Sequence, residues 1–248
     1  RVLAMVMTVM MLGISCDAPA TYSAGGTHEN LTVLFEEWRE FEKPEFMHGI
    51  PDYSLNAMNA QRRDLVAWQA RLHALDPSDW SVAEQIDWHL VRAEMNGLEF
   101  DHRLRQPWAR DPAFYVTVYP AESDVPAHEG TVIHGWIDLW TYDYPLSQSN
   151  SDDLTARIGT IPALLEQARV NLTGDARDLW LAGYRSFTNQ SDDLAALGER
   201  VAGMSAALDS VIVTAREASY AFRVWLEEQA PFKTGLSGVG KENYTWYM

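Results

Sequence analysis

Apolar residues recur at steps of three and four along most of this chain, which is the spacing of one face of an α-helix. Leu31, Leu34 and Trp38 keep to this spacing, with charged residues between them. No segment has the sustained alternation of apolar and polar residues that a half-buried strand requires. The pattern therefore predicts an all-α protein, an irregular array of many helices. The predicted helices span residues 29–46, 55–75, 81–105, 151–161, 163–170, 175–187 and 194–228.

Polar residues that can cap a first turn mark several helix starts. Ser81, with Glu84 three residues later, has the pattern of a capping box. The segments 151–154 and 191–194 both read Ser-Asp-Asp-Leu, which places a serine and two carboxylates where a helix N-terminus favours them. We expect both segments to begin helices, and we expect Gly203 to mark a bend or turn.

The part between Pro107 and Pro145 is the least regular. Residues 114–119 fit either a short strand or an aromatic helical turn, and residues 131–139 fit a short helix. Aromatic residues gather here; core packing is their commoner role, and a ligand-binding cleft is the alternative. The candidate cleft residues are Tyr115, Tyr119, His134, Trp136, Trp140 and Tyr142.

The beginning of the chain has the layout of a bacterial export signal. Arg1 precedes an apolar run that is shorter than the ~20 residues needed to cross a bilayer. The run ends at Cys16, at the position where a lipoprotein signal carries the cysteine that becomes lipidated. We therefore predict a signal peptide at 1–16, lipidation of Cys16 and a flexible tether at 17–27. An ordinary cleaved signal with an incidental cysteine is the alternative.

Composition narrows the classes of partner. The net charge is −16, with 19 basic and 35 acidic residues, so cations are too few to neutralise a nucleic-acid backbone, and no basic stripe is present. The same acidity disfavours peripheral binding to anionic lipid, and leaves the lipid anchor as the predicted contact with the membrane. Because Cys16 is the only cysteine, an internal disulfide and a cysteine-based zinc cluster are excluded in this chain.

A glycine-rich segment near the end of the chain resembles a phosphate-binding loop. Residues 235–242 read Gly-Leu-Ser-Gly-Val-Gly-Lys-Glu, so Glu242 stands where that loop has the hydroxyl that binds Mg²⁺. The residues before it have helical rather than strand spacing. We predict no nucleotide binding, and a connector that opens a new helix at about Lys241. Because that helix ends after two turns, we expect residues 28–248 to be the N-terminal helical part of a larger domain.

No catalytic or metal-binding set can be assigned from spacing. His128 and Glu129 are followed by a second histidine only at His134, whereas a zincin pair lies four residues apart on one helical face. Val132 occupies the position of that ligand, and no G-x-S-x-G motif of a serine hydrolase occurs. The adjacent carboxylate pairs are better explained as caps or solvated faces. We therefore predict no catalytic, cofactor or metal residue within this chain.

Six segments together resemble the N-terminal half of the bacterial "domain of unknown function 885" family. The resemblance extends from about residue 31 to the last residue. It is carried by residues 35–39 (Phe-Glu-Glu-Trp-Arg), 51–53 (Pro-Asp-Tyr), 75–77 (Leu-Asp-Pro), 87–94 (Asp-Trp-His-Leu-Val-Arg-Ala-Glu), 162–172 (Pro-Ala-Leu-Leu-Glu-Gln-Ala-Arg-Val-Asn-Leu) and 238–247 (Gly-Val-Gly-Lys-Glu-Asn-Tyr-Thr-Trp-Tyr).

This resemblance implies an exported protein similar to helical zinc-dependent carboxypeptidases and oligopeptidases, often with a lipoprotein signal. The family's H-E-x-x-P-G-H metal motif lies in the half that follows residues 238–247, so no catalytic residue is carried over to this chain. The resemblance implies zinc and a peptide substrate for the intact protein, located in the bacterial cell envelope, periplasmic or at the outer surface. The alternative is a non-catalytic binding lipoprotein of the cell surface or periplasm.

Overall fold

The computed structural model describes residues 26–122 and 133–247. Within them the chain is an all-α, irregular array of helices with two very short sheets, as the spacing of apolar residues predicts. The elements are α1 (His28–Phe41), β1 (Phe46–Met47), β2 (Ile50–Pro51), α2 (Leu55–His73), α3 (Val82–Phe100), η1 (Asp101–Arg105), α4 (Pro107–Arg110), η2 (Pro112–Tyr115), β3 (Val118–Tyr119), β4 (Ile137–Asp138), η3 (Leu139–Thr141), α5 (Gln148–Ile158), α6 (Ile161–Asn171), α7 (Arg177–Val201), α8 (Ala206–Gln229), η4 (Ala230–Phe232) and α9 (Gly240–Tyr247).

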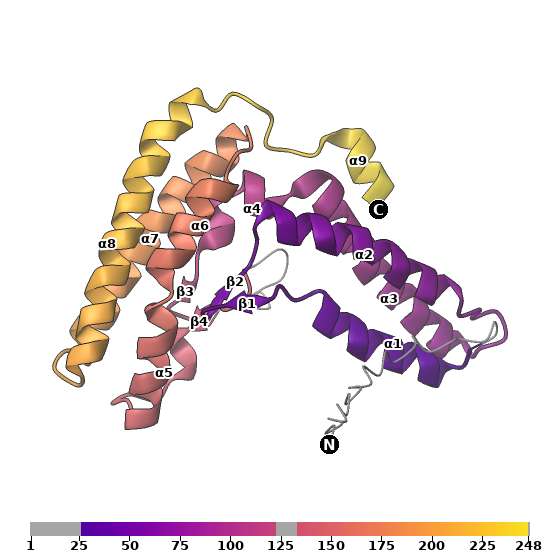
Figure 1. The fold of residues 1–248 in the computed structure, drawn as a ribbon, viewed down its shortest axis with the longest axis horizontal. Coiled ribbons are helices and arrows are strands. Elements are labelled where there is room, and N and C mark those ends of the chain that lie inside the picture. Colours follow the sequence, from indigo (N-terminus) through magenta and orange to yellow (C-terminus); the bar gives the residue numbers. More distant parts are fainter. Residues whose placement is uncertain (1–25, 123–132, 248) are drawn as a thin grey trace, which may run out of the picture.

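The helices form two arms that meet near the short strands (Figure 1). We call α1, α2, α3 and η1 the N-terminal arm, and α4 to α8 with their connections the C-terminal arm. The buried apolar side chains form two clusters. One lies within the N-terminal arm, and the other fills the C-terminal arm and includes Met58 of α2. Helix α9 lies beside the N-terminal arm, although an extended connector joins it to the end of the C-terminal arm (Figure 1).

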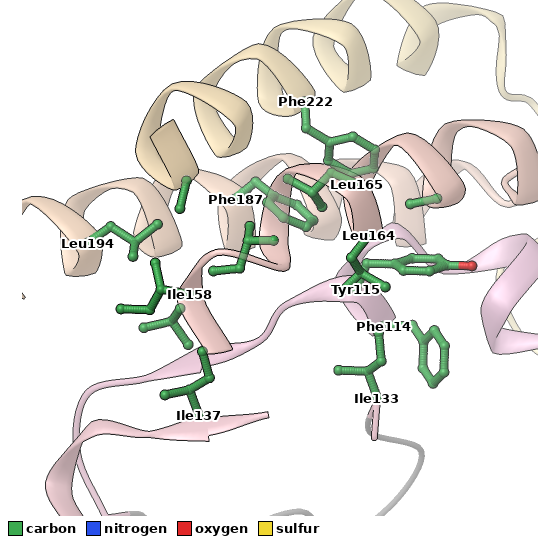
Figure 2. Close-up of a cluster of buried hydrophobic side chains, with 14 of the residues drawn as sticks. Phe114, Tyr115, Ile133, Ile137, Ile158, Leu164, Leu165, Phe187, Leu194 and Phe222 are labelled. Atoms are coloured by element: carbon green, nitrogen blue, oxygen red, sulfur yellow. The ribbon is translucent and has the colours of Figure 1, made fainter. Parts of the chain in front are cut away.

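The C-terminal arm is built on the long pair α7 and α8 (Figure 1). Phe187 of α7 and Phe222 of α8 are both fully buried, with ring centroids 4.6 Å apart in an edge-to-face arrangement. Figure 2 shows these two rings facing each other, with Leu165 of α6 beside them. Burying one such ring contributes about 1.5–3 kcal/mol, so the apolar faces predicted from the sequence supply most of the packing here.

Several predictions that rest on neighbouring residues in the sequence are confirmed. Ser81 accepts a hydrogen bond from the Glu84 N–H, and Glu84 accepts one from the Ser81 N–H, which completes the predicted capping box of α3. The break between α5 and α6 falls at 159–160, and Gly203 lies in the turn between α7 and α8 at φ +75°. The helix predicted to open at about Lys241 is α9.

Two predicted helices differ from the structure. The first helix ends at Phe41 rather than at residue 46, because the ring of Pro44 cannot be accommodated in a continuing helix. The predicted short helix at 131–139 is, from residue 133 onward, a turn followed by β4 and η3. Gly135 at φ +88° is incompatible with a helix there, and residues 131–132 lie outside the described part.

The two Ser-Asp-Asp-Leu segments are not helix starts. Helix α5 begins three residues earlier, with Ser147 accepting from the Asn150 N–H, and Ser151 is buried inside the helix. Helix α7 runs without a break through Ser191, which is buried in its middle. The apolar face of α7 continues through Leu194 onto α8, so packing between the helices outweighs the local preference of serine for a cap.

The glycine-rich connector is held by side chains of the C-terminal arm. The Asp175 carboxylate accepts hydrogen bonds from the N–H groups of Thr234 and Gly235, at 2.6 and 2.8 Å. A Cβ at Gly235 would lie 2.0 Å from the Asp175 carbonyl oxygen, so only glycine fits there. Arg110 donates to the Leu236 carbonyl at 3.1 Å. These contacts give the segment a structural role of its own.

None of the helices in residues 26–122 and 133–247 combines the length and apolar character needed to cross a membrane. The predicted signal peptide, Cys16 and the tether to residue 25 fall outside the described residues, so lipidation of Cys16 stays a prediction.

Candidate functional site

A groove with a volume of about 720 Å³ lies between α1 and α3. The lining residues of each helix recur at helical spacing, so one face of each helix forms one wall. The α1 wall comprises His28, Leu31, Thr32, Phe35 and Glu42 at the end of the helix. The opposite wall comprises Asp87, Leu90, Val91, Ala93, Glu94, Gly97, Leu98 and Asp101, and Tyr247 of α9 completes the lining.

A smaller cavity of about 240 Å³ adjoins this groove where the two arms meet. Four residues line both cavities: Glu42, Gly97, Leu98 and Asp101. At Gly97 an added Cβ would meet nothing within 4 Å, so this position borders open space. We use the name α1–α3 groove for the two cavities together.

Carboxylates surround an apolar floor in the α1–α3 groove. Leu31 and Val91 are buried at 2% and 6% exposure, whereas Glu94 is half exposed. Burial raises the pKa of the Glu42 carboxyl, and the neighbouring Glu94 raises it further, while Arg39 opposes both effects. Arg39 contacts both carboxylates, at 2.9 Å from Glu42 and 3.4 Å from Glu94.

The end of α1 is fixed by a side chain of α2. Gln61 donates from Nε2 to the Glu42 carbonyl at 3.0 Å, and its Oε1 lies 2.8 Å from Nε2 of His102. His102 is buried next to Trp108. Burial lowers its pKa to about 4, and the nearby Arg62 cation lowers it in the same direction. A neutral imidazole therefore supports Gln61, which in turn holds Glu42 at the groove.

The junction between the arms is an aromatic and amide cluster. Tyr53 and Phe114 pack edge to face at 4.9 Å. Two amides of α6 hold this segment: Gln167 accepts from the Tyr53 N–H at 3.0 Å, and Asn171 donates to the Tyr53 carbonyl at 2.9 Å. The Tyr53 hydroxyl accepts from the His134 N–H at 3.0 Å. Burial raises the pKa of Tyr53, so its hydroxyl stays protonated.

The six residues of the candidate cleft lie in separate places. Tyr115 is fully buried and donates to the Trp108 carbonyl at 2.7 Å. Tyr119 lines a shallow cavity of about 550 Å³ beside α7, together with Asp193. His134 is the one of the six that lines the α1–α3 groove.

The other three cleft residues lie near α5. Trp136 donates to Asp138 at 3.1 Å, and Tyr142 donates to Asp153 and accepts from Arg157. Trp140 is 39% exposed. A ligand role for these six residues stays a prediction, and the side chains that line the α1–α3 groove come mainly from α1 and α3.

Zinc does not fit the side chains that the structure describes. In residues 26–122 and 133–247, no group of three or more histidine, cysteine, aspartate or glutamate side chains is arranged to hold a metal ion. His134 is half-buried, and burial together with the cations of Lys43 and Arg39 lowers its pKa. His128 and Glu129 lie outside the described residues. We therefore derive no chemical step through a metal in this chain.

The sequence alone did not reveal the groove, although it contained one signal. Gly97 is an isolated glycine within a strong helical pattern, which is a costly choice unless a packing or functional reason keeps it. The structure is consistent with such a reason, because Gly97 borders open space in the groove. The position of Glu42 at the groove depends on its contacts with Gln61 and Arg39. No spacing in the sequence predicts these contacts.

No family model matches the chain, and no curated protein matches it. Among solved structures, it is similar to a protein of Shewanella oneidensis that is described provisionally as a lipoprotein of unknown function. The TM-score is 0.62 at 17% sequence identity, over 89% of this chain and 41% of that chain. This likeness shows the fold, and our chain spans about two fifths of the length of the protein that it matches.

Proposed function

We propose that the chain is the N-terminal helical part of an exported, lipid-anchored bacterial protein of the zinc-peptidase-like class, and that the α1–α3 groove binds peptide. The observation that carries this proposal is the groove itself. It combines a volume of about 720 Å³, an apolar floor and a few charged groups, which is the usual make-up of a ligand site. A volume of this size accommodates several residues of a peptide.

Two observations support a location in the cell envelope. Cys16 follows an apolar run and precedes a polar tether, which is the geometry of a lipid anchor. The similar fold in Shewanella oneidensis is described provisionally as a lipoprotein. Together they favour an envelope lipoprotein, periplasmic or at the outer surface.

The hydrolytic part of the proposal rests on the resemblance in six segments. Because the metal motif of the resembling family follows the segment that matches residues 238–247, we propose that the zinc ligands belong to a further part of the intact protein. The α1–α3 groove would then contribute substrate binding, with no residue of this chain taking part in bond cleavage. The alternative is a lipoprotein that binds peptide without hydrolysing it.

Membrane attachment is tested in the intact protein, produced in a bacterium that lipidates its exported proteins. We expect the wild type in the membrane fraction and Cys16→Ala in the soluble fraction, with acyl chains on the wild type by mass spectrometry. Equal partition of both proteins, or a wild type without acyl chains, contradicts the anchor.

Catalysis is tested separately, by elemental analysis and by incubation with a mixed peptide library. About one zinc ion per molecule, and library cleavage that a chelator stops, support the peptidase. A protein that retains peptides intact and contains no metal supports the binding lipoprotein instead.

A further inference from the structure

We infer that the α1–α3 groove prefers peptide segments that carry lysine or arginine next to apolar side chains. The inference deepens the proposed function and rests on it, since it takes peptide to be the ligand. It adds a preference for positively charged peptides. Neither the six-segment resemblance nor the similar solved structure indicates the charge of a ligand.

Charge is the first ground for this preference. Four carboxylates line the larger cavity: Asp87, Glu94, Glu42 and Asp101. The permanent cations that act on them include Arg39, beside Glu42 and Glu94, Lys43, next to Glu42 in the chain, and Arg105, beside Asp101 at 3.1 Å. The His28 imidazole lies 2.9 Å from Asp87. Four carboxylates therefore line the cavity of a chain whose net charge is −16, which favours a ligand with a cationic side chain over one with an anionic side chain.

The position of these carboxylates strengthens the attraction. Glu42 is largely buried, and burial raises the pKa of its carboxyl, so its ionised form lacks part of the solvation that water would provide. A ligand cation close to Glu42 and Glu94 would replace that solvation. Interactions of this kind are stronger in a partly enclosed groove than on an open surface.

The apolar lining is the second ground. Phe35 and Leu98 are half-buried at the walls, and Leu90 is 59% exposed on α3. These residues lie on the same faces as the carboxylates. A ligand that matches both the carboxylates and the apolar lining must present apolar groups and a cation within a few residues. A peptide in which basic and leucine-like side chains are close together does so.

Gly97 makes the inference testable without disturbing the fold. Its open surroundings mean that a larger side chain would extend into the groove instead of into packed atoms. Leucine and alanine are both better helix formers than glycine, so neither should unfold α3. Gly97→Leu adds a bulky side chain where the two cavities share their lining, and Gly97→Ala adds one methyl group at the same place.

The experiment is fluorescence anisotropy with the full 248-residue chain and two labelled, end-blocked hexapeptides. One probe is Leu-Lys-Leu-Leu-Lys-Leu, and the other has glutamate in place of both lysines. We expect the basic probe to bind at least tenfold more tightly at low ionic strength, with a smaller difference in higher salt. Mass spectrometry after the measurement establishes that the probes are intact.

The variants assign the binding to the groove. Gly97→Leu should weaken the basic probe at least tenfold, and Gly97→Ala, which adds a smaller group to the same wall, should weaken it by a smaller factor. Glu94→Gln should weaken the basic probe several-fold and leave the acidic probe unchanged. Glu228→Gln, the same change at an exposed position of α8, should alter neither, and circular dichroism should show equal helix content in every variant.

Three outcomes overturn the inference in distinguishable ways. Equal affinity for the two probes removes the charge preference but leaves peptide binding at the groove in place. If neither probe binds, the groove does not bind peptide, and the proposed function loses its main support. A dimer in sedimentation analysis that Gly97→Leu dissociates assigns the groove to a second copy of this chain.

Discussion

His102 and Gln61 form a hydrogen bond of 2.8 Å between the imidazole Nε2 and the side-chain oxygen of the amide. Since an amide oxygen can only accept, the ring nitrogen donates. The bond joins η1 to α2, and the other end of the same amide holds the last turn of α1. One glutamine of α2 thus connects the end of α1 with η1, which directly follows α3.

His102 should make stability depend on pH. Burial lowers its pKa from 6.5 to about 4, so between these values the unfolded chain binds a proton that the folded chain does not. Stability is therefore lost as the pH falls from 6.5 towards 4, by about 2–3 kcal/mol for this group. Urea unfolding of the wild type and His102→Gln should show a shallower pH dependence in the variant. Parallel curves would contradict a buried neutral imidazole.

A buried glutamine should be important for the C-terminal arm. Gln190 is 1% exposed; its oxygen accepts from the N–H of Thr117 at 2.8 Å, and its nitrogen donates to Ser219 at 3.0 Å. Gln190→Leu keeps the volume but leaves polar groups unpaired, so we expect a loss of about 2–4 kcal/mol in the free energy of unfolding. Ser219→Ala should cost about 1 kcal/mol by the same measurement. A larger effect at Ser219 would be inconsistent with this network.

Two helical glycines should respond in opposite directions to alanine. A Cβ at Gly183 of α7 would lie 2.5 Å from Cβ of Pro112, whereas a Cβ at Gly97 of α3 would meet nothing within 4 Å. We expect Gly97→Ala to stabilise by about 0.5–1 kcal/mol through helix propensity. Gly183→Ala should destabilise by about 1–3 kcal/mol, because overpacking outweighs that gain. Denaturant unfolding of both variants checks the signs.

Asp175 should protect the glycine-rich connector from proteolysis. Its hydrogen bonds to the N–H groups of Gly235 and Thr234 lower the pKa of its carboxyl from 3.8. Their contribution is present above about pH 3.8 and is lost as the pH falls through the lower folded value. We expect Asp175→Ala to speed tryptic cleavage at Lys233 and Lys241 several-fold at neutral pH. Asp192→Ala, at an exposed position of α7, should leave the cleavage rate unchanged.

The features that could be predicted from the sequence are those that depend only on residues close together in the chain. The capping box of Ser81 and Glu84 involves one helical turn, and periodicity is a property of each segment, so the helices and the fold class followed from the sequence. Ser191 was misassigned because its position in α7 depends on packing against α8. The groove was missed for the same reason: Phe35 and Glu94 face it from different helices, and their proximity depends on tertiary structure.

The separation of the buried side chains into two clusters, one within the N-terminal arm and one centred on the C-terminal arm, determines how the molecule should respond to heat. Each cluster is large enough to form a cooperative unit, and local opening in proteins follows such units. Calorimetry should then resolve two overlapping transitions, of which Leu34→Ala, in the cluster of the N-terminal arm, shifts one and Gln190→Leu the other. Hydrogen exchange should likewise assign the amides of α3 and of α7 to different opening reactions, so that a ligand in the α1–α3 groove slows exchange in α3 first.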